Sequence, residues 1–277
     1  MTVDAGNYVD RVGAKGGCSN KCQFIVTSYE GLHYDVLNIA RQEVAMGYET
    51  LVAMRDTTEE TKFVSANLID VNTGKPLFDP YIIRNYGNMR IGVMGLLRPA
   101  DFPPHSSGID TVNLRTEDFM ATAAKYMPTL QRKCNAIVIL AELPTADVEA
   151  LVEAYPEIDL IISTGALRTG EQISDIGKTK VIGTGSSGYN GHWLSMEFDP
   201  AWGDSIAFDT FRDQLTDQYD EKGEWSDRLA AFEGKSKAQA KAEAPKKVNQ
   251  ITKGQIESSK ETTAKDLKSV SKKATDK

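Results

Sequence analysis

The sequence predicts an α/β fold, and three observations support this prediction. Short apolar strands alternate along the chain with segments of helical periodicity, which is the pattern of α/β domains. Residues 135–140 and 160–163 are apolar without alternation, which indicates strands of a sheet that is covered on both faces. With 277 residues and 40% hydrophobic content, the chain can form one large domain with a sizeable core and still leave a tail.

Strands and helices alternate through the first hundred residues. A helix that includes residues 24–31 leads into a strand, and a second helix is expected over residues 42–54 because apolar residues recur there at helical spacing. Gly87-Asn88 is typical of a hairpin turn between two strands. The predicted strands of this part are residues 2–5, 34–39, 63–68, 81–86 and 90–97.

The next hundred residues continue this alternation. Residues 116–133 are predicted to form a helix with two acidic residues in its first turn and two basic residues in its last, the charge order that a helix dipole favours. Another helix is expected to begin near Thr145. The predicted strands here are residues 135–140, 160–163, 180–182 and 189–198.

One glycine-rich segment matches the pattern Gly-x-Gly-x-x-Gly of dinucleotide-binding loops, at residues 183–188. Such a loop needs a helix after it, because the helix N-terminus holds the pyrophosphate. Residues 189–198 instead alternate between polar and apolar, which predicts a strand. The sequence therefore predicts a tight turn at these glycines and no bound cofactor.

Five stretches resemble, in their order and rough spacing, the 5′-nucleotidase branch of the calcineurin-like metallophosphatases. The resemblance covers about residues 1–200 and implies a metallophosphatase-like αββα sandwich, in which two packed mixed β-sheets are flanked by helices. It also implies that an opening strand, which carries the family's Asp-x-His motif, would lie before Met1. The five stretches are residues 3–7, 34–43, 63–68, 91–96 and 158–165.

The resemblance implies a site for two divalent metals, but the chain carries other residues at most ligand positions. The bridging aspartate of the family's Gly-Asp motif is an asparagine here, and the motif Gly-Asn-His-Glu reads Ala-Arg-Gln-Glu. A glutamate stands where the fourth motif has a ligand histidine, and glycine and leucine stand at the two histidine positions of the fifth. These positions are Asn7, Ala40, Arg41, Gln42, Glu43, Glu142, Gly165 and Leu167.

Of these positions, only Glu43 and Glu142 keep the ability to bind a metal ion. We expect the two carboxylates to form an ion pair with Arg41 instead of a dimetal centre. The sequence therefore predicts no catalytic residue, no metal ligand and no cofactor-binding residue.

The cysteines and histidines do not supply another site. Cys18 and Cys22 form either a local disulfide or two ordinary thiols, and they lack the second ligand pair of a zinc site. Cys134 is predicted to be a small core residue. The histidines are not at ligand spacing and are expected to be surface or hydrogen-bonded residues. They are His33, His105 and His192.

Charge separates a body, residues 1–234, from a tail, residues 235–277. The body carries 34 acidic and 20 basic residues, which argues against nucleic-acid binding, and the tail carries 12 lysines and five acidic residues. The tail is expected to be solvated, and disordered or helical, with contact to an anionic surface as the alternative. The chain has no transmembrane run and opens without a secretory signal, whereas the resemblance implies a periplasmic or extracellular protein.

Two classes of function remain. We favour a non-catalytic protein that keeps the metallophosphatase fold and serves as a binding or structural subunit of a protein assembly. The chain resembles degenerate domains of exported bacterial proteins that are associated with multihaem cytochromes, which implies a protein partner or an oligomer. The alternative is a divergent metal-dependent phosphohydrolase of the 5′-nucleotidase type that uses Glu43 and Glu142 on nucleotides or other phosphoesters.

Overall fold

The computed structural model describes residues 1–9, 20–98, 112–166, 173–184, 190–198, 206–214 and 223–243. The chain divides into two compact units, Met1–Tyr219 and Asp220–Lys277. The described part of the second unit is helix α6 (Glu224–Glu243), where Arg228 stacks on Trp225 at 4.5 Å from the ring centroid. In the described ranges, no helix is long and apolar enough to cross a membrane.

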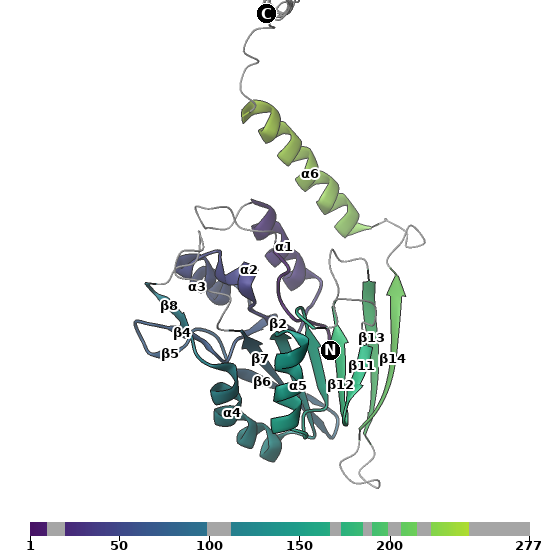
Figure 1. Cartoon of the computed structure of the whole chain (residues 1–277). Helices are drawn as coiled ribbons and strands as arrows, with labels where there is room; N and C mark the ends of the chain where they lie inside the picture. The colour runs from purple at the N-terminus through teal and green to yellow at the C-terminus, as the bar shows by residue number, and fades with distance from the viewer. Residues whose placement is uncertain are drawn as a thin grey trace, which may run out of the picture. The chain divides into compact units, whose positions relative to one another are not determined.

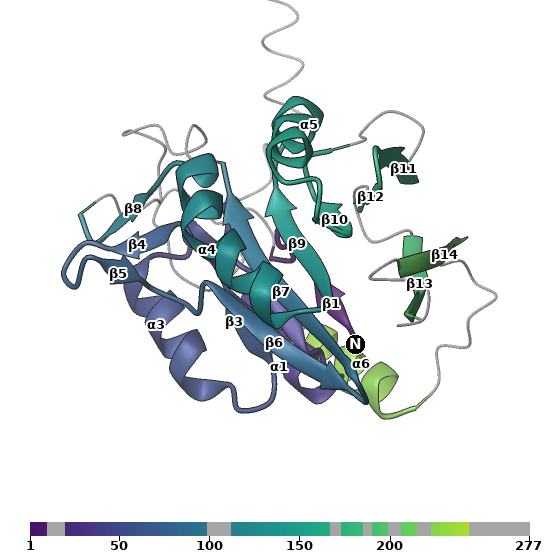
Figure 2. The same ribbon diagram turned by 90° about the horizontal axis from the view of Figure 1, so that it is seen from below.

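The first unit is a four-layer αββα sandwich, with two β-sheets between two layers of helices (Figures 1 and 2). The larger sheet has the strand order β11-β12-β10-β9-β7-β6, with β7, β9, β10 and β12 parallel and the two edge strands antiparallel. Its strands are β6 (Tyr81–Tyr86), β7 (Met89–Leu97), β9 (Ala136–Glu142), β10 (Leu160–Ser163), β11 (Ile173–Ile176) and β12 (Thr179–Gly183).

The second sheet is parallel and has the order β1-β2-β3. It consists of β1 (Val3–Asp4), β2 (Val36–Asn38) and β3 (Lys62–Val64). A small antiparallel sheet of order β5-β4-β8 and a hairpin complete the unit. These contain β4 (Leu68–Asp70), β5 (Lys75–Pro76), β8 (Leu114–Thr116), β13 (Asn190–Phe198) and β14 (Ile206–Gln214).

The helices cover the outer faces of the two sheets. Helices α4 and α5 lie on the six-stranded sheet, and α1 to α3 lie on the three-stranded parallel sheet (Figures 1 and 2). The helices are α1 (Asn20–Gly31), α2 (Arg41–Val44), α3 (Tyr48–Thr57), α4 (Phe119–Lys133) and α5 (Thr145–Ala154).

Strand β9 shows why the larger sheet must be covered on both faces. Its residues alternate between two apolar clusters: Ile137, Ile139 and Ala141 pack with α4 and α5, whereas Val138 and Leu140 pack between the two sheets. All five side chains are at most 3% exposed. The absence of polar alternation in the sequence is thus explained by two buried faces, and the predicted αββα sandwich is confirmed.

Two predicted elements are each divided into two in the structure. The helix expected over residues 42–54 is broken between α2 and α3, where Gly47 has φ 89, a left-handed value that favours glycine. The strand expected over residues 63–68 ends at Val64 and restarts as β4. Between them, the buried side chain of Asn67 accepts a hydrogen bond from Leu97 N (2.9 Å) and donates to Glu117 O (2.9 Å). Both breaks depend on tertiary contacts or backbone geometry that hydrophobic periodicity does not encode.

Helix α4 begins later than predicted, at Phe119. Asp118 is its N-cap and accepts a hydrogen bond from Ala121 N (2.8 Å), so the two acidic residues precede the first turn. The chain just before them belongs to β8, whose pairing with β4 holds it in an extended conformation. By contrast, β6 and β10 have the predicted bounds, and β13 is the predicted strand after the glycine-rich segment.

The cysteines and histidines are found in different settings. Cys22 is disulfide-bonded, Cys134 is a half-buried free thiol, and both Cys18 and His105 lie outside the described residues. His33 is an exposed residue that contacts Glu60 Oε2 (3.0 Å), as expected.

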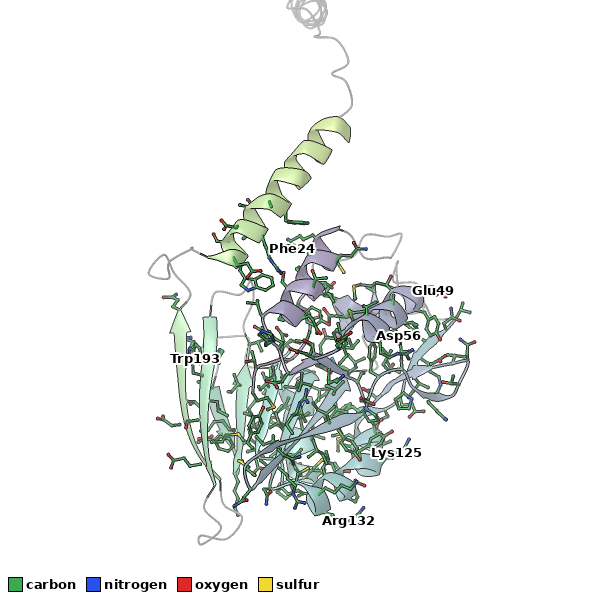
Figure 3. The ribbon with its side chains drawn as sticks, turned by 180° about the vertical axis from the view of Figure 1, so that it is seen from behind. Phe24, Glu49, Asp56, Lys125, Arg132 and Trp193 are labelled. Atoms are coloured by element: carbon green, nitrogen blue, oxygen red, sulfur yellow. The ribbon has the colours of Figure 1, made fainter. Side chains whose placement is uncertain are left out.

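His192 does not meet the expectation, because both of its ring nitrogens are buried without a hydrogen-bond partner among the described residues. Burial lowers its pKa, and so does the charge of Arg212. The next residue on β13, Trp193, is 58% exposed (Figure 3).

Asp159 provides a test of how burial couples stability to pH. It precedes β10 and accepts a hydrogen bond from Ile137 N (2.8 Å), and burial raises its pKa from 3.8 to about 6. Its folded-state pKa lies above its unfolded value, so its contribution to stability is fully present below pH 4 and is lost as pH rises through 6. We expect Asp159→Asn, which keeps an acceptor oxygen, to raise the free energy of unfolding at pH 7 by on the order of 1–2 kcal/mol and to leave it nearly unchanged at pH 4.

Urea unfolding from pH 4 to 7.5 measures this difference. Glu157→Gln, which removes an exposed carboxylate two residues away, is the matched control and should give parallel curves for variant and wild type. An Asp159→Asn curve parallel to the wild type over the same range would contradict the prediction.

Candidate functional site

The predicted site residues meet where four strands end. Asn7 follows β1, the stretch Ala40 to Glu43 follows β2 and begins α2, Glu142 ends β9, and Gly165 follows β10. The carboxyl ends of parallel strands lie at one edge of a sheet, and the two packed sheets bring these edges together. Leu167 lies outside the described residues.

Asn7 is the centre of this site. Its Nδ2 donates to Glu142 Oε1 (2.9 Å) and to Thr164 Oγ1 (3.1 Å), and its Oδ1 accepts from Gln42 N (3.0 Å). Asn7 has φ 61, a left-handed conformation that asparagine tolerates better than most residues. One amide side chain therefore joins the last residue of β9 to the segments that follow β1, β2 and β10.

The loop that holds Asn7 requires a close approach of two backbones. Gly6 has φ 101, and a Cβ atom added to it would lie 2.4 Å from Ala40 Cβ. Gly6 N donates to Asp4 Oδ1 (2.9 Å), which closes the turn. Small residues at positions 6 and 40 thus allow the loop after β1 to lie against the start of α2.

Glu142 connects this loop to α2. Its Oε1 accepts from Asn7, and its Oε2 accepts from Arg41 N at 2.6 Å. The predicted ion pair with Arg41 is wrong: the Arg41 side chain is exposed, and the described residues show no ion pair between its guanidinium and either glutamate. Arg41 is the first residue of α2, so its backbone N–H has no helical acceptor and is available to Glu142.

Glu43 is fully buried and accepts hydrogen bonds from the backbone of the loop after β1. Its Oε2 accepts from Asn7 N (2.8 Å) and Ala40 N (3.0 Å), and its Oε1 accepts from Val9 N (3.2 Å). Burial raises the pKa of Glu43 to about 7, although the three backbone N–H donors favour the carboxylate and partly offset this effect. The acceptor atoms of Glu43 are directed at the backbone of this loop and of its own helix.

Sequence analysis missed several polar residues beneath the site. Tyr29 donates to Asp4 Oδ2 (2.8 Å), and burial raises the pKa of Asp4. Asn38 is fully buried and donates to Ala5 O (3.0 Å), and the Tyr8 hydroxyl is buried without a partner among the described residues. Asp4 and Asn38 each interrupt an apolar strand, which was a detectable signal of a buried polar network.

The described residues of the site do not fit a pair of divalent cations. Asn7, Glu43 and Glu142 already direct their oxygens at N–H donors, and Gly165 has no side chain to offer. Over the described ranges, no group of three or more His, Cys, Asp or Glu side chains is arranged to hold a metal ion. The arrangement is a hydrogen-bonded junction between loops, in which the side chains satisfy one another and nearby backbone groups.

Comparison with known proteins gives both sequence and structural relatives. No family model matches the chain. It is 32% identical over 161 residues to a 2′,3′-cyclic-nucleotide 2′-phosphodiesterase/3′-nucleotidase of Yersinia enterocolitica, a match that covers 50% of this chain and 23% of that protein. A protein of the same name from Salmonella typhimurium is 31% identical over 160 residues, covering 50% of this chain and 24% of the relative.

Two solved structures share the fold. Sulfate thiohydrolase SoxB of Thermus thermophilus gives a TM-score of 0.68 at 20% identity, over 87% of this chain and 42% of that one. A 5′-nucleotidase precursor, also from Thermus thermophilus, gives a TM-score of 0.68 at 20% identity, over 85% of this chain and 49% of that one.

These matches agree with the motifs and with the layers of the fold. The chain spans about a quarter of the length of the two curated relatives named above, and less than half of each structural neighbour. The motif resemblance, the αββα layers and the site at the strand ends all point to the same family. The sequence relatives and structural neighbours of this chain are thus proteins of the calcineurin-like metallophosphatase and 5′-nucleotidase families, and the chain shares their fold.

Proposed function

We propose that this chain is a non-catalytic metallophosphatase-fold protein that acts as a binding or structural subunit of a protein assembly. The observation that carries the proposal is the Asn7–Glu142 junction, in which groups at the family's ligand positions bond to one another. A dimetal hydrolase needs several oxygen and nitrogen ligands that converge on open space. Here the acceptors are directed at N–H groups, and an amide replaces the bridging carboxylate.

The setting of the protein is also part of this proposal. The fold resemblance points to an exported protein, and the degenerate site points to a surface role with a protein partner, for which a multihaem cytochrome is our candidate. Analytical ultracentrifugation of the purified chain, alone and mixed with such a cytochrome, tests the partner. Sedimentation of the two proteins as separate species at micromolar concentration would count against it.

Calorimetric titration of the purified chain with Mn²⁺ tests the loss of metal chemistry. We expect no saturable binding, and no hydrolysis of bis(p-nitrophenyl) phosphate or of a 2′,3′-cyclic nucleotide in the presence of Mn²⁺. Gln42→His, which restores one family residue, should still give no activity, because a dimetal centre requires its ligands together. Stoichiometric Mn²⁺ binding that is lost in Glu142→Gln, together with hydrolysis, would overturn the proposal.

The names of the relatives favour a second candidate, a divergent metal-dependent phosphohydrolase. Three of the four curated relatives found are 2′,3′-cyclic-nucleotide 2′-phosphodiesterase/3′-nucleotidases, so kinship supports an enzyme better than it supports a binding protein. In that case Glu43 and Glu142 would need to release their backbone donors to serve as ligands, together with residues outside the described ranges. The Mn²⁺ titration separates the two candidates, because only the second requires a metal.

A further inference from the structure

A pocket of about 330 Å³ lies beside α3, along the edge of β3 that faces away from β2. Its wall is formed by the end of α3, by β3 and by the segment after β5, and none of its residues belongs to the Asn7–Glu142 junction. Its volume is within the range of small-molecule sites. The residues that decide its chemistry are Arg55, Thr58, Lys62, Phe63, Phe78 and Asp79.

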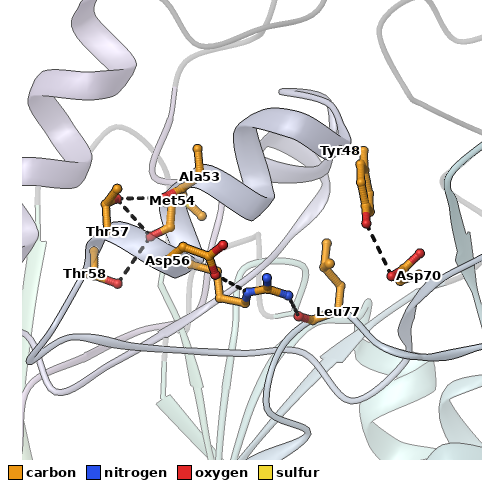
Figure 4. Close-up of polar contacts among 9 residues, drawn as sticks. Tyr48, Ala53, Met54, Asp56, Thr57, Thr58, Asp70 and Leu77 are labelled. Atoms are coloured by element: carbon orange, nitrogen blue, oxygen red, sulfur yellow. Dashed lines mark hydrogen bonds and ion pairs between the residues drawn. The ribbon is translucent and has the colours of Figure 1, made fainter. Parts of the chain in front are cut away.

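Arg55 is held in a fixed orientation at the rim of this pocket. Its Nε donates to Asp56 Oδ1 (2.8 Å), and its Nη1 donates to Leu77 O (3.2 Å). Asp56 and Leu77 are labelled in Figure 4. These bonds use two of the five N–H groups of the guanidinium, which leaves part of the planar fork available. A pinned arginine loses little conformational entropy when it binds an oxyanion.

Lys62 adds a second positive charge. Its Nζ donates to the neutral backbone oxygen of Glu59 (2.7 Å), which positions the ammonium group without neutralising it. Two N–H donors of the ammonium group remain. The Thr58 hydroxyl donates its one proton to Met54 O (3.3 Å), so Arg55 and Lys62 are the donors available to an oxyanion here (Figure 4).

The remaining wall of the pocket is apolar or acidic. Phe63 and Phe78 stack edge to face with ring centroids 5.9 Å apart, and each is about 5% exposed, so they form a firm floor. Asp79 is an exposed carboxylate on the same wall, and Asp56 forms an ion pair with Arg55. These two carboxylates balance the charges of the two cationic side chains, so an oxyanion would bind through their N–H donors and not through a net positive charge. A ligand would therefore need one oxyanion group for the cations and a small apolar body for the floor.

We propose that this pocket binds a small molecule in which one phosphate or carboxylate group is attached to an apolar body. The fixed fork of Arg55 and the ammonium of Lys62 bind the oxyanion, and the apolar body packs near Phe63 and Phe78. Because the pocket shares no residue with the junction, the proposal is independent of whether the protein is a hydrolase.

Calorimetric titration of the full chain with phenyl phosphate tests the pocket, with inorganic phosphate and phenol as partial probes. We expect phenyl phosphate to bind about tenfold more tightly than either probe, because only it has both groups. Benzoate in place of phenyl phosphate distinguishes a carboxylate preference from a phosphate preference. Equal binding of phenyl phosphate and inorganic phosphate would overturn the apolar half of the proposal.

Three substitutions test whether phenyl phosphate binds in this pocket. Lys62→Gln should weaken phenyl phosphate binding about tenfold, whereas Lys75→Gln, an exposed lysine of β5 outside the pocket, should leave it unchanged. Asp79→Asn should strengthen binding about two- to threefold, because it removes an opposing charge. A gain of affinity cannot result from partial unfolding. If neither Lys62→Gln nor Asp79→Asn changes the affinity, the pocket is not the site.

Discussion

Asn7→Asp is expected to destabilise the fold by about 2–4 kcal/mol at pH 8, although it restores the residue that the family's enzymes carry. The side chain would lose the amide donor to Glu142 Oε1, now 2.9 Å away, and would set a second carboxylate against the first. Asparagine and aspartate both tolerate the left-handed backbone at this position, so backbone strain does not explain the cost. Urea unfolding at pH 8 measures the loss, which should shrink at pH 5 as one of the paired carboxyls becomes protonated.

Glu142→Gln should rescue the Asn7→Asp variant. In the double variant the glutamine amide can donate to the new aspartate, and its oxygen can still accept from Arg41 N. A double-mutant cycle should therefore give a favourable coupling energy of at least about 1 kcal/mol. Asn85→Asp, at an exposed position of β6, is the matched control and should cost little. Additive effects of Asn7→Asp and Glu142→Gln would contradict a direct contact between the two side chains.

The second large effect is expected from Gly95→Ala in β7. A Cβ atom at this position would lie 2.4 Å from Asn38 Oδ1 and 2.6 Å from the backbone oxygen of Val64. The backbone of β3 cannot move without disturbing the packing of the two sheets, so we expect a loss of about 3 kcal/mol in the free energy of unfolding. Denaturant unfolding monitored by circular dichroism measures this loss.

Gly92→Ala is the matched control on the same strand. The added Cβ atom would meet Leu130 Cδ2 at 2.7 Å and Cys134 Sγ at 2.8 Å, which are the ends of flexible side chains that can rotate. We expect a cost of about 1 kcal/mol, clearly smaller than that of Gly95→Ala. Equal costs for the two substitutions would mean that the approach of β7 to β3 is looser than the structure indicates.

Local sequence pattern was sufficient for the elements whose conformation depends on nearby residues. The runs that became β6 and β10 are rich in apolar and β-branched residues and are bounded by turn residues, and helix α5 begins at Thr145 with an acidic residue in its first turn. The strand after the glycine-rich segment was predicted from alternation, and β13 confirms it. Elements that end because of a distant partner were not predictable in this way, as with the strand that stops at Val64 before the buried Asn67.

The candidate site was predicted as a set of positions but not as a set of contacts. The family's motif spacing identified Asn7, Glu43 and Glu142, and the structure brings them to one edge of the sandwich. The expected ion pair with Arg41 does not form, because Glu142 accepts a hydrogen bond from the backbone N–H of Arg41 and not from its guanidinium. The charges of the two residues alone do not predict which of these groups makes the contact. The pocket beside α3 had no signal in the sequence, since its residues come from three segments and none forms a motif.

The sequence by itself predicted the α/β alternation of the main strands and helices and the two buried faces of the larger sheet, but not the short strands β5, β8 and β11 or the strand β14. These properties depend on hydrophobic pattern and residue identity, which are local to each segment. Only the tertiary structure decided that Asn7, Glu142 and the start of α2 bond to one another, and that Arg55 and Lys62 share one pocket. Contacts of this kind join residues as far as 135 positions apart, as Asn7 and Glu142 are, and their distances are set by how the two sheets pack.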